Sequence, residues 1–178
     1  MLMENSISSR LTREFFSRDV LEVAPEMPGK IMLIKEPRGK LRRYMITEVE
    51  AYRGVEDLAC HASRGRTSRT EIMYSEGGHL YIYLIYGVYW MLNIVTGAPG
   101  NPQAILIRGL DGISGPGRIT RDLGIDRSWY GIDIVKSEII YLENNNTYIE
   151  VNRAPRIGID YSGEPWKSKP WRYFASKT

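Results

Sequence analysis

The sequence predicts an α+β fold in a single domain, residues 1–178, built from mainly antiparallel strands with interposed helices. Its 178 residues fit one domain and can bury a core without metals or disulfides. Hydrophobic residues make up 43% and charged residues 25%, which are globular proportions and argue against disorder. A helical period near the start gives way to β-rich runs, and no repeat or Gly-, Ser- or Pro-rich linker divides the chain.

The first elements expected are a helix and a hairpin. One amphipathic helix is predicted over residues 11–24, because apolar residues such as Phe16 and Val20 stand at helical spacing and a proline follows. Two β-rich runs come next, at residues 30–36 and 42–52. The Pro-Arg-Gly-Lys sequence between them has a turn composition, so the two runs are expected to form an antiparallel hairpin.

The remaining elements are expected in the following order. They are short helical turns in residues 54–78, core strands at 79–95 and 103–110, a short helix after the Gly-Pro-Gly of residues 115–117, and late strands at 139–143 and 148–152. Gly124 should end the short helix, and the polar turn of residues 144–146 lies between the late strands. The C-terminal segment, residues 163–175, is rich in Pro and Trp and is expected to pack back onto the sheet.

Composition excludes several classes of protein. One cysteine cannot form an internal disulfide, and with two histidines it cannot fill a structural zinc site, so neither a metal nor another cofactor is expected. No signal peptide and no run of 18 apolar residues occur, so the protein is expected inside the cell and without a membrane partner. Nothing in the sequence indicates an interface, so a monomer is expected.

Charge is compatible with a polyanionic partner but does not decide for one. The formal charge is +3 and the pI is near 8.9. Solvated loops explain the basic clusters equally well. These clusters are Arg38, Lys40, Arg42 and Arg43; Arg64, Arg66 and Arg69; and Lys167, Lys169 and Arg172.

Two strand patterns carry candidate chemistry. In TEVEAY, alternation places Glu48, Glu50 and Tyr52 on one face, which is either a solvated acidic face or part of a site. In YIYLIYGVYW, alternation places Tyr81 and Tyr83 on one face. Tyr83 lies inside the sheet, while Tyr86, followed directly by a glycine, can stand at a hairpin tip and serve as a wedge. Core packing of the aromatic stripe is the alternative.

Three further residues have both a structural and a functional interpretation. His61 lies in a polar loop, where it caps a turn or contacts a substrate edge. Arg108 closes an apolar strand, where a cation usually pairs with a carboxylate or extends outward to solvent, and it forms a site if its partner is Glu50. Asn93 interrupts an apolar run, where a buried amide bonds either to a neighbouring strand or to a ligand.

Taken together, the motifs resemble the alkyladenine (3-methyladenine) DNA glycosylase family over nearly the whole chain. The matching segments are REFFSRDVLEVA, EVEAYRGVEDLACHASRGRTSRTEIMY, HLYIYLIYGVYWMLNIV, AILIRGL, GPGRITRDLGI and PRIGIDYSGEPWKSKPWRYF. The resemblance implies a single compact α+β domain with a curved, largely antiparallel sheet flanked by helices. It also implies a β-hairpin that inserts into the minor groove of DNA.

The resemblance assigns roles position by position. Glu50 matches the catalytic general base and Arg108 the arginine that helps to hold the attacking water. Tyr52 and Tyr83 match the rings that stack about the flipped base, and His61 matches the histidine that contacts its edge.

Two more roles concern selectivity and grip on DNA. Asn93 matches the asparagine that helps to exclude the amino group of guanine, and Tyr86 matches the side chain that fills the gap in the duplex. DNA phosphates are expected to be bound by Arg64, Arg66, Arg69 and Arg118.

The implied activity is base excision repair of double-stranded DNA that contains damaged purines, and the implied location is inside the cell, with the DNA. Candidate lesions are 3-methyladenine, 7-methylguanine, hypoxanthine and ethenoadenine, flipped out and released by hydrolysis of the N-glycosidic bond. No lysine stands at a Schiff-base position, so a monofunctional enzyme that leaves an abasic site is expected. The alternatives are a non-catalytic module that binds damaged or single-stranded nucleic acid, and a carbohydrate enzyme with Glu48 and Glu50 as its acid and base.

The chain departs from the family pattern in three places. Only residues 109–114 separate the arginine strand from the Gly-Pro-Gly loop, where relatives usually have a longer segment. Arg118 stands where lysine is common, which keeps a phosphate-binding charge. Thr70 stands where asparagine is common, and the sequence assigns it no role.

Overall fold

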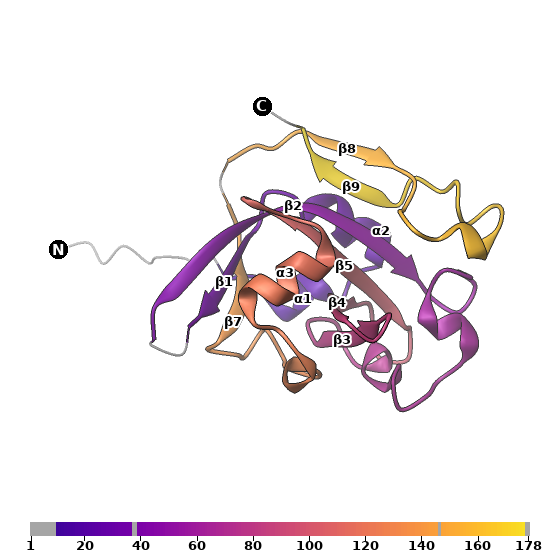
Figure 1. The fold of residues 1–178 in the computed structure, drawn as a ribbon, viewed down its shortest axis with the longest axis horizontal. Helices are drawn as coiled ribbons and strands as arrows, with labels where there is room; N and C mark the ends of the chain where they lie inside the picture. The colour runs from indigo at the N-terminus through magenta and orange to yellow at the C-terminus, as the bar shows by residue number, and fades with distance from the viewer. Residues whose placement is uncertain (1–9, 37–38, 146, 177–178) are drawn as a thin grey trace.

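The fold is built on an antiparallel sheet (Figure 1). The structure is a computed structural model, and it describes residues 10–36, 39–145 and 147–176. Nine strands belong to the sheet within these residues, in the order β3-β4-β5-β2-β1-β7, with β6, β8 and β9 attached at the side. The strands are β1 (Ile31–Lys35), β2 (Leu41–Arg53), β3 (Leu80–Ile85), β4 (Tyr89–Thr96), β5 (Gln103–Leu110), β6 (Ile113–Ser114), β7 (Ile140–Glu143), β8 (Val151–Ala154) and β9 (Arg172–Ala175). The predicted α+β class and mainly antiparallel sheet are confirmed.

The helices are short. They are α1 (Arg13–Phe16), α2 (Val20–Val23), α3 (Pro116–Leu123) and the 3-10 turns η1 (Ala24–Glu26), η2 (His61–Arg64), η3 (Glu71–Tyr74), η4 (Arg127–Trp129) and η5 (Asp160–Ser162). In the part of the chain that is described, none of them is long and apolar enough to cross a bilayer. The turns η2 and η3 lie in residues 54–78, so the short helical turns expected there are confirmed.

The prediction of one helix over residues 11–24 was wrong. Two four-residue helices occupy the segment, and the side chain of Asp19 caps the second by accepting the N–H of Leu21 at 2.9 Å. A capping aspartate competes with helix continuation, because its carboxylate replaces a backbone acceptor. The apolar pattern itself was informative, since Phe16 and Val20 are buried in the core.

The later expectations divide in the same way. The short helix α3 ends at Gly124, which has the left-handed φ of 66° of a helix C-cap, as predicted. The late strands do not pair with each other: β7 pairs with β1, whereas β8 pairs with β9, which lies against β2. The C-terminal segment thus packs back onto the sheet through β9. In the predicted β1–β2 hairpin, which is confirmed, Pro37 and Arg38 lie outside the described residues.

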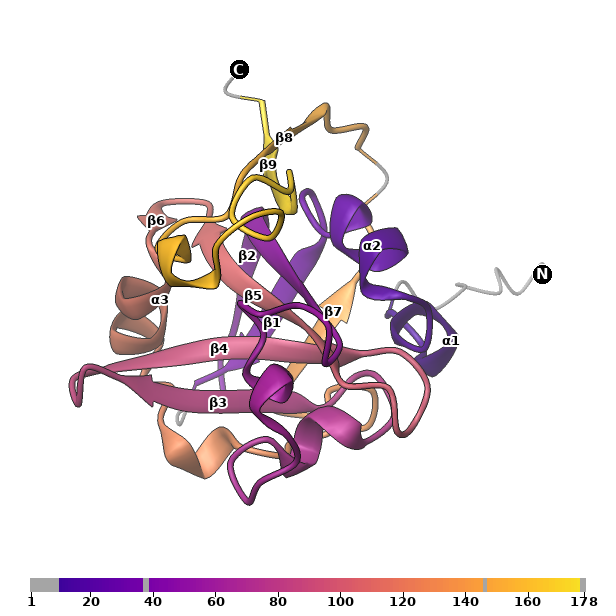
Figure 2. The same ribbon diagram turned by 90° about the vertical axis from the view of Figure 1, so that its right-hand side faces the viewer.

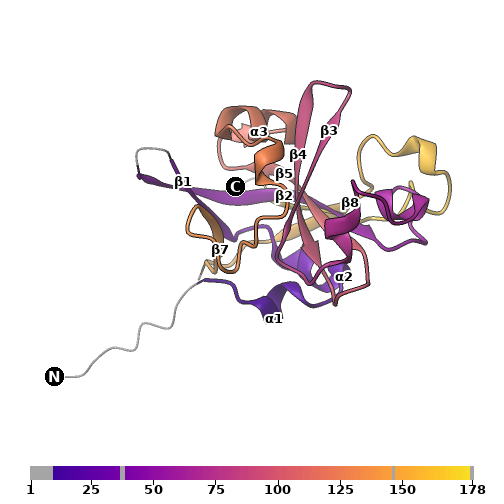
Figure 3. The ribbon, with the colours of Figure 1, turned by 90° about the horizontal axis from the view of Figure 1, so that it is seen from below.

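The two faces of the sheet have different roles. One face carries the main hydrophobic core, which includes Val49, Ala51, Leu80, Ile82, Leu92, Ile94, Ile105 and Ile107 together with side chains of α2 and α3. The alternate positions of the same strands point to the other face. Figures 2 and 3 show the β3–β4 hairpin projecting from the body on the side opposite α1 and α2.

Candidate active site

Strand register brings five side chains into one row across the second face of the sheet. Tyr81 lies opposite Asn93, Asn93 opposite Leu106, Leu106 opposite Glu50, and Glu50 opposite Arg172. Because side chains of directly paired residues share a face, segments up to 122 positions apart in the sequence meet in this row. The predicted alternation of Tyr81 and Tyr83 on one face of β3 is confirmed.

A cavity of about 340 Å³ opens beside this row. That volume lies in the range of small-ligand sites. Its wall contains Tyr52, His61, Tyr83, Asn93 and Arg108, all singled out in the sequence, and Tyr86 stands at its rim. The other lining side chains are Ala59, Cys60, Met73, Tyr81, Ile85, Met91, Ala104, Leu106, Pro116, Ile157, Ile159 and Tyr161.

Glu50 lies behind this wall with no solvent-exposed surface. Its Oε1 accepts the backbone N–H of Ile157 at 2.7 Å, and its Oε2 accepts the Tyr52 hydroxyl at 2.8 Å. The guanidinium Nε of Arg108 lies 3.5 Å from Oε1. Since Tyr52, Arg108 and Ile157 all line the cavity, the carboxylate is one layer from whatever occupies it.

Burial raises the pKa of Glu50 above its ordinary value, because desolvation outweighs the opposing effects of Arg108, the Ile157 N–H, Tyr52 and Arg156. A buried carboxylate with a raised pKa and several hydrogen-bond donors is typical of a proton acceptor tuned for chemistry. Glu48 differs from Glu50, because 22% of its side-chain surface is exposed whereas the Glu50 side chain is fully buried.

Glu48 and Arg108 belong to a chain of ion pairs that ends on β9. Oε1 of Glu48 lies 3.4 Å from Arg108 Nε and accepts Arg172 Nη1 at 3.0 Å. The β2–β5 register shifts on both sides of Glu48, so a bulge aims its side chain at Arg108. Gly109 permits this bulge, because a Cβ there would meet Thr47 Oγ1 at 2.6 Å. The sequence analysis expected Arg108 to form a site only if it lies next to Glu50. It does lie next to Glu50, and Glu48 is a second carboxylate partner.

The sequence analysis missed a buried ion pair that supports Tyr52. Arg156 donates to both carboxylate oxygens of Asp57, at 2.6 and 2.9 Å, and both side chains are fully buried. The guanidinium carbon lies 4.8 Å from the Tyr52 ring centroid and 5.0 Å from that of Trp171. Arg156 lies in the segment PRIGI, so the resemblance covered it but gave no residue-level signal.

His61 and two tyrosines form the opposite wall. Nδ1 of His61 lies 2.8 Å from the Tyr81 hydroxyl, and its ring meets that of Tyr83 edge-on with centroids 4.5 Å apart. Burial, with additional repulsion from Arg69 and Arg64, lowers the pKa of His61 to about 4. The imidazole is therefore neutral at physiological pH and does not repel a positively charged ligand.

Asn93 is buried and its amide group is held by the backbone. Nδ2 donates to the carbonyls of Tyr81 at 3.1 Å and Met91 at 3.3 Å. The structural interpretation weighed for Asn93 is thus correct, and it is compatible with a role in the cavity, which Asn93 lines. With its N–H groups engaged, Asn93 limits the space of the cavity at a fixed position.

Tyr86 stands at the tip of the β3–β4 hairpin with 86% of its surface exposed. Its φ of 54° is the only left-handed value among non-glycine residues in the described segments, and Gly87 follows with φ 68°. Left-handed backbone at a tyrosine is strained by about 1 kcal/mol or more and often marks a functional position. Leu84, Val88 and Tyr89 are also exposed there, so the tip is an apolar projection.

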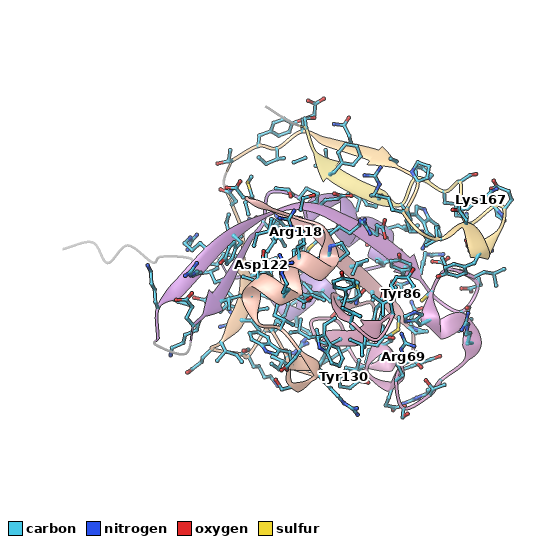
Figure 4. The ribbon with its side chains drawn as sticks, viewed as in Figure 1. Arg69, Tyr86, Arg118, Asp122, Tyr130 and Lys167 are labelled. Atoms are coloured by element: carbon cyan, nitrogen blue, oxygen red, sulfur yellow. The ribbon has the colours of Figure 1, made fainter. Side chains whose placement is uncertain are left out.

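The predicted phosphate contacts differ in their availability. Arg64, Arg69 and Arg118 are exposed and form no ion pair with a carboxylate among the described residues. Arg66 instead holds Glu71 through two hydrogen bonds of 2.6 and 2.9 Å. In Figure 4, Arg118 lies on one side of Tyr86 and Arg69 on the other.

The other basic clusters are mostly engaged. Arg42 pairs with Glu36 and Arg43 with Glu143, while Arg38 lies outside the described residues. Thr70, the residue without an assigned role, is buried, and its hydroxyl lies 2.9 Å from the N–H of Thr67, which it accepts. Thr70 therefore fixes the loop that carries Arg69.

Comparison with known proteins agrees with this geometry. The family model described as Methylpurine-DNA glycosylase (MPG) matches residues 14–113 and 111–178. A protein of Rickettsia felis (strain ATCC VR-1525 / URRWXCal2) is 41% identical over 170 residues, which covers 92% of this chain and 91% of the relative. A protein of Sodalis glossinidius is 39% identical over 179 residues, covering 97% and 98%. A protein of Methanocella arvoryzae is 38% identical over 184 residues, covering 92% and 91%. All three are named "Putative 3-methyladenine DNA glycosylase".

Proposed function

Because this chain belongs to the methylpurine-DNA glycosylase family, we propose that it flips a damaged purine out of duplex DNA and hydrolyses its N-glycosidic bond. The proposed lesions are alkylated purines, such as 3-methyladenine and 7-methylguanine, and the altered purines hypoxanthine and ethenoadenine. The observation that carries the proposal is the buried Glu50 carboxylate directly behind a cavity walled by aromatic rings.

Glu50 acts as the general base in this proposal. The bond between C1′ and the purine nitrogen breaks, and its electron pair leaves with the base. Water forms the new bond to C1′ and gives its proton to Glu50. A carboxylate near C1′ also offsets the positive charge that develops on the sugar. The hydrogen bonds from Ile157 and Tyr52 fix the carboxylate, and Arg108 favours its ionised form.

The aromatic walls provide the binding energy for the flipped base. Tyr52 forms one wall, held from behind by Arg156, while Tyr83 and His61 form the other. Stacking of a base on an aromatic ring contributes roughly 1–3 kcal/mol. Because these rings are already positioned by the sheet, little side-chain freedom is lost on binding. Asn93 is proposed to exclude the 2-amino group of guanine by occupying the space that this group needs.

Tyr86 is proposed to fill the gap that the flipped nucleotide leaves. The β3–β4 hairpin projects from the body (Figure 3). The exposed Tyr86 ring at its tip can enter the base stack while the neighbouring cavity receives the lesion. Extrusion of a base costs a few kcal/mol, least where pairing is already weakened. A wedge that replaces the lost stacking lowers this cost.

The enzyme is proposed to be monofunctional. No lysine lines the cavity, and burial raises the pKa of the Cys60 thiol to about 12, so neither a Schiff base nor a thiolate is available beside the sugar. Hydrolysis by water then leaves an abasic site in an intact strand.

Single-turnover release of base from duplex DNA tests the proposal. Hypoxanthine and 7-methylguanine duplexes are compared for the native protein, Glu50→Gln and the neighbouring control Glu48→Gln. The proposal requires release by the native protein, loss of release in Glu50→Gln with DNA binding retained, and substantial release in Glu48→Gln. Loss in both variants would favour an acid–base pair, and binding without release by the native protein would identify a non-catalytic damage binder.

A further inference from the structure

A second groove, of about 590 Å³, runs along the free edge of β3 next to the cavity. Strand β3 is the last strand in the sheet order, and the groove is flanked by Arg69 on one side and by Arg127 and Tyr130 on the other. Its residues also include Ile82, Leu84 and Trp90. None of the residues that line it is acidic, so the groove is cationic.

Both cations are available to a ligand. Arg69 and Arg127 are exposed, and neither forms an ion pair with a carboxylate among the described residues. The guanidinium carbon of Arg69 lies 5.1 Å from the Tyr83 ring centroid, so its charge stands beside the cavity wall. The sequence analysis did not single out Arg127, because it lies outside the three basic clusters.

Tyr130 holds the two sides of the groove together. Its hydroxyl accepts the backbone N–H of Ile72 at 3.2 Å and lies 3.3 Å from the carbonyl of Arg69, to which it can donate. Because Tyr130 directly follows η4, which begins at Arg127, it joins the Arg127 segment to the loop that carries Arg69. The backbone positions from which Arg69 and Arg127 extend are therefore held relative to each other.

The floor of the groove offers backbone donors. Leu80 bonds outward from β3, through its N–H to Ile132 O at 2.8 Å and its carbonyl to Gly131 N at 2.9 Å. In an antiparallel ladder, alternate residues direct their peptide groups to the same edge. The N–H groups of Ile82 and Leu84 therefore face the groove, beyond the end of the pairing with residues 131–132. Phosphate groups of DNA are commonly bound by such N–H groups together with arginines.

We propose that this β3-edge groove binds a phosphodiester of the damaged strand next to the flipped nucleotide. The proposal rests on the proposed function. The strand assignment follows from Tyr83, whose side chain lines both the groove and the cavity, so a strand that delivers its nucleotide to the cavity passes the groove with a neighbouring linkage. Arg127 and Arg69 neutralise this linkage, and Tyr130 is a positioning residue that sets their separation.

Binding to duplexes that carry a stable abasic-site analogue tests the groove without requiring excision. Arg127→Gln is compared with Arg121→Gln, a control in which the exposed arginine already pairs with Asp122 at 2.8 Å. We expect Arg127→Gln to lose about tenfold in affinity at low salt, because one charge-assisted contact to a phosphate is lost. The salt slope should fall by about 1. The Arg121→Gln control should change little.

Single neutral methylphosphonate linkages then locate the contact. At one position of the damaged strand near the lesion, the neutral linkage should weaken binding by the native protein at least as much as Arg127→Gln does. It should weaken binding by Arg127→Gln less than binding by the native protein, because only the Arg69 contact is then left to lose. The proposal is overturned if the neutral linkage and Arg127→Gln act independently at every position of that strand. It is also overturned if they are coupled on the undamaged strand instead. If the chain releases no base, the proposed catalytic activity is wrong. Coupling on the abasic duplex would still support phosphate binding in the groove, so the two proposals can be told apart. Tyr130→Phe should keep the salt slope while lowering affinity less than Arg127→Gln, and an unchanged affinity would remove Tyr130 from the argument.

Discussion

The cavity and the hairpin tip share strands β3 and β4, yet they are built on opposite principles. At the cavity, Asn93 in the wall and Glu50 behind it are buried, and their side chains are hydrogen-bonded. At the tip, Tyr86 is 86% exposed and its backbone is strained. The difference separates two tasks: a fixed low-dielectric site suits bond cleavage, while an exposed apolar wedge suits insertion into stacked bases.

This contrast predicts that the largest functional effect comes from the cavity. Glu50→Gln keeps the shape of the side chain and removes the base, so base release should fall by roughly 10³-fold or more, as expected when a general base is lost. The free energy of unfolding should not fall. Burying the charged Glu50 carboxylate is unfavourable in the native protein, and an uncharged glutamine removes this cost. Single-turnover kinetics and thermal unfolding of the same samples measure both quantities. A proportional loss of activity and stability would mean that Glu50 is structural.

The pH dependence of that pair of proteins sharpens the prediction. The pKa of Glu50 is raised in the folded state, so its contribution to stability is present at low pH and is lost as pH rises through the folded pKa. The stability of the native protein relative to Glu50→Gln should therefore decline with rising pH. The rate of base release should rise over the same interval, above the ordinary pKa of about 4.3 for glutamate. His61, with a pKa of about 4, contributes equally to both proteins and cancels from the comparison. A flat stability difference across pH 4–8 would contradict the assignment.

The next largest effect should come from the support of the cavity. Asp57→Asn leaves Arg156 as an uncompensated buried cation, which typically costs about 3–5 kcal/mol. Chemical denaturation measures this loss. Because Arg156 also lies over Tyr52, base release should weaken at temperatures where the variant is still folded. Asp160→Asn, at an exposed carboxylate that forms no ion pair in the described segments, is the matched control and should leave both quantities unchanged. A variant of Asp57 as stable as the native protein would show that the pair is dispensable.

How far the sequence could predict this site depends on which contacts are local. Alternation along β3 placed Tyr81 and Tyr83 on one face correctly, because side-chain direction in a strand follows from neighbouring positions alone. The row from Tyr81 to Arg172 required the register of five strands, which no single segment contains. The helix break at Asp19 arose from a capping contact that competes with helical spacing.

The basic clusters were also hard to interpret from the sequence, because the carboxylates that pair with them are determined by the fold. Arg64, Arg66 and Arg69 form one cluster in the sequence, but only the fold reveals that Arg66 is bound to Glu71. Arg127, outside any cluster, faces a groove without acidic residues. The number of arginines in a segment therefore says less about DNA binding than the carboxylates that the fold places beside them.

At the tip, the expected effects are intermediate. Tyr86→Ser should lower the single-turnover rate by an amount equivalent to roughly 1–3 kcal/mol, the usual contribution of a stacked ring. The deficit should shrink on a mispaired lesion, whose extrusion costs less. Stability should stay the same or rise slightly, because the ring is exposed and the left-handed φ of 54° does not depend on it. An equal deficit on paired and mispaired lesions would indicate that Tyr86 does not act on extrusion.

The smallest expected effect is on the salt dependence of DNA binding, and it should differ between Arg64 and Arg66, which lie in one loop. Arg64→Gln should reduce the salt slope of binding to undamaged duplex by about 1, as expected when one phosphate contact is lost. Arg66→Gln should reduce it less, because Arg66 must first leave Glu71, although an exposed pair of this kind contributes only about 0–1 kcal/mol. Glu71→Gln frees Arg66 and should raise the affinity at low salt. Affinity measured between 50 and 200 mM salt decides the matter. Equal slopes for Arg64→Gln and Arg66→Gln would mean that ion pairing in the free protein does not determine which cations bind DNA, and the argument for Arg127 would then rest on the groove geometry alone.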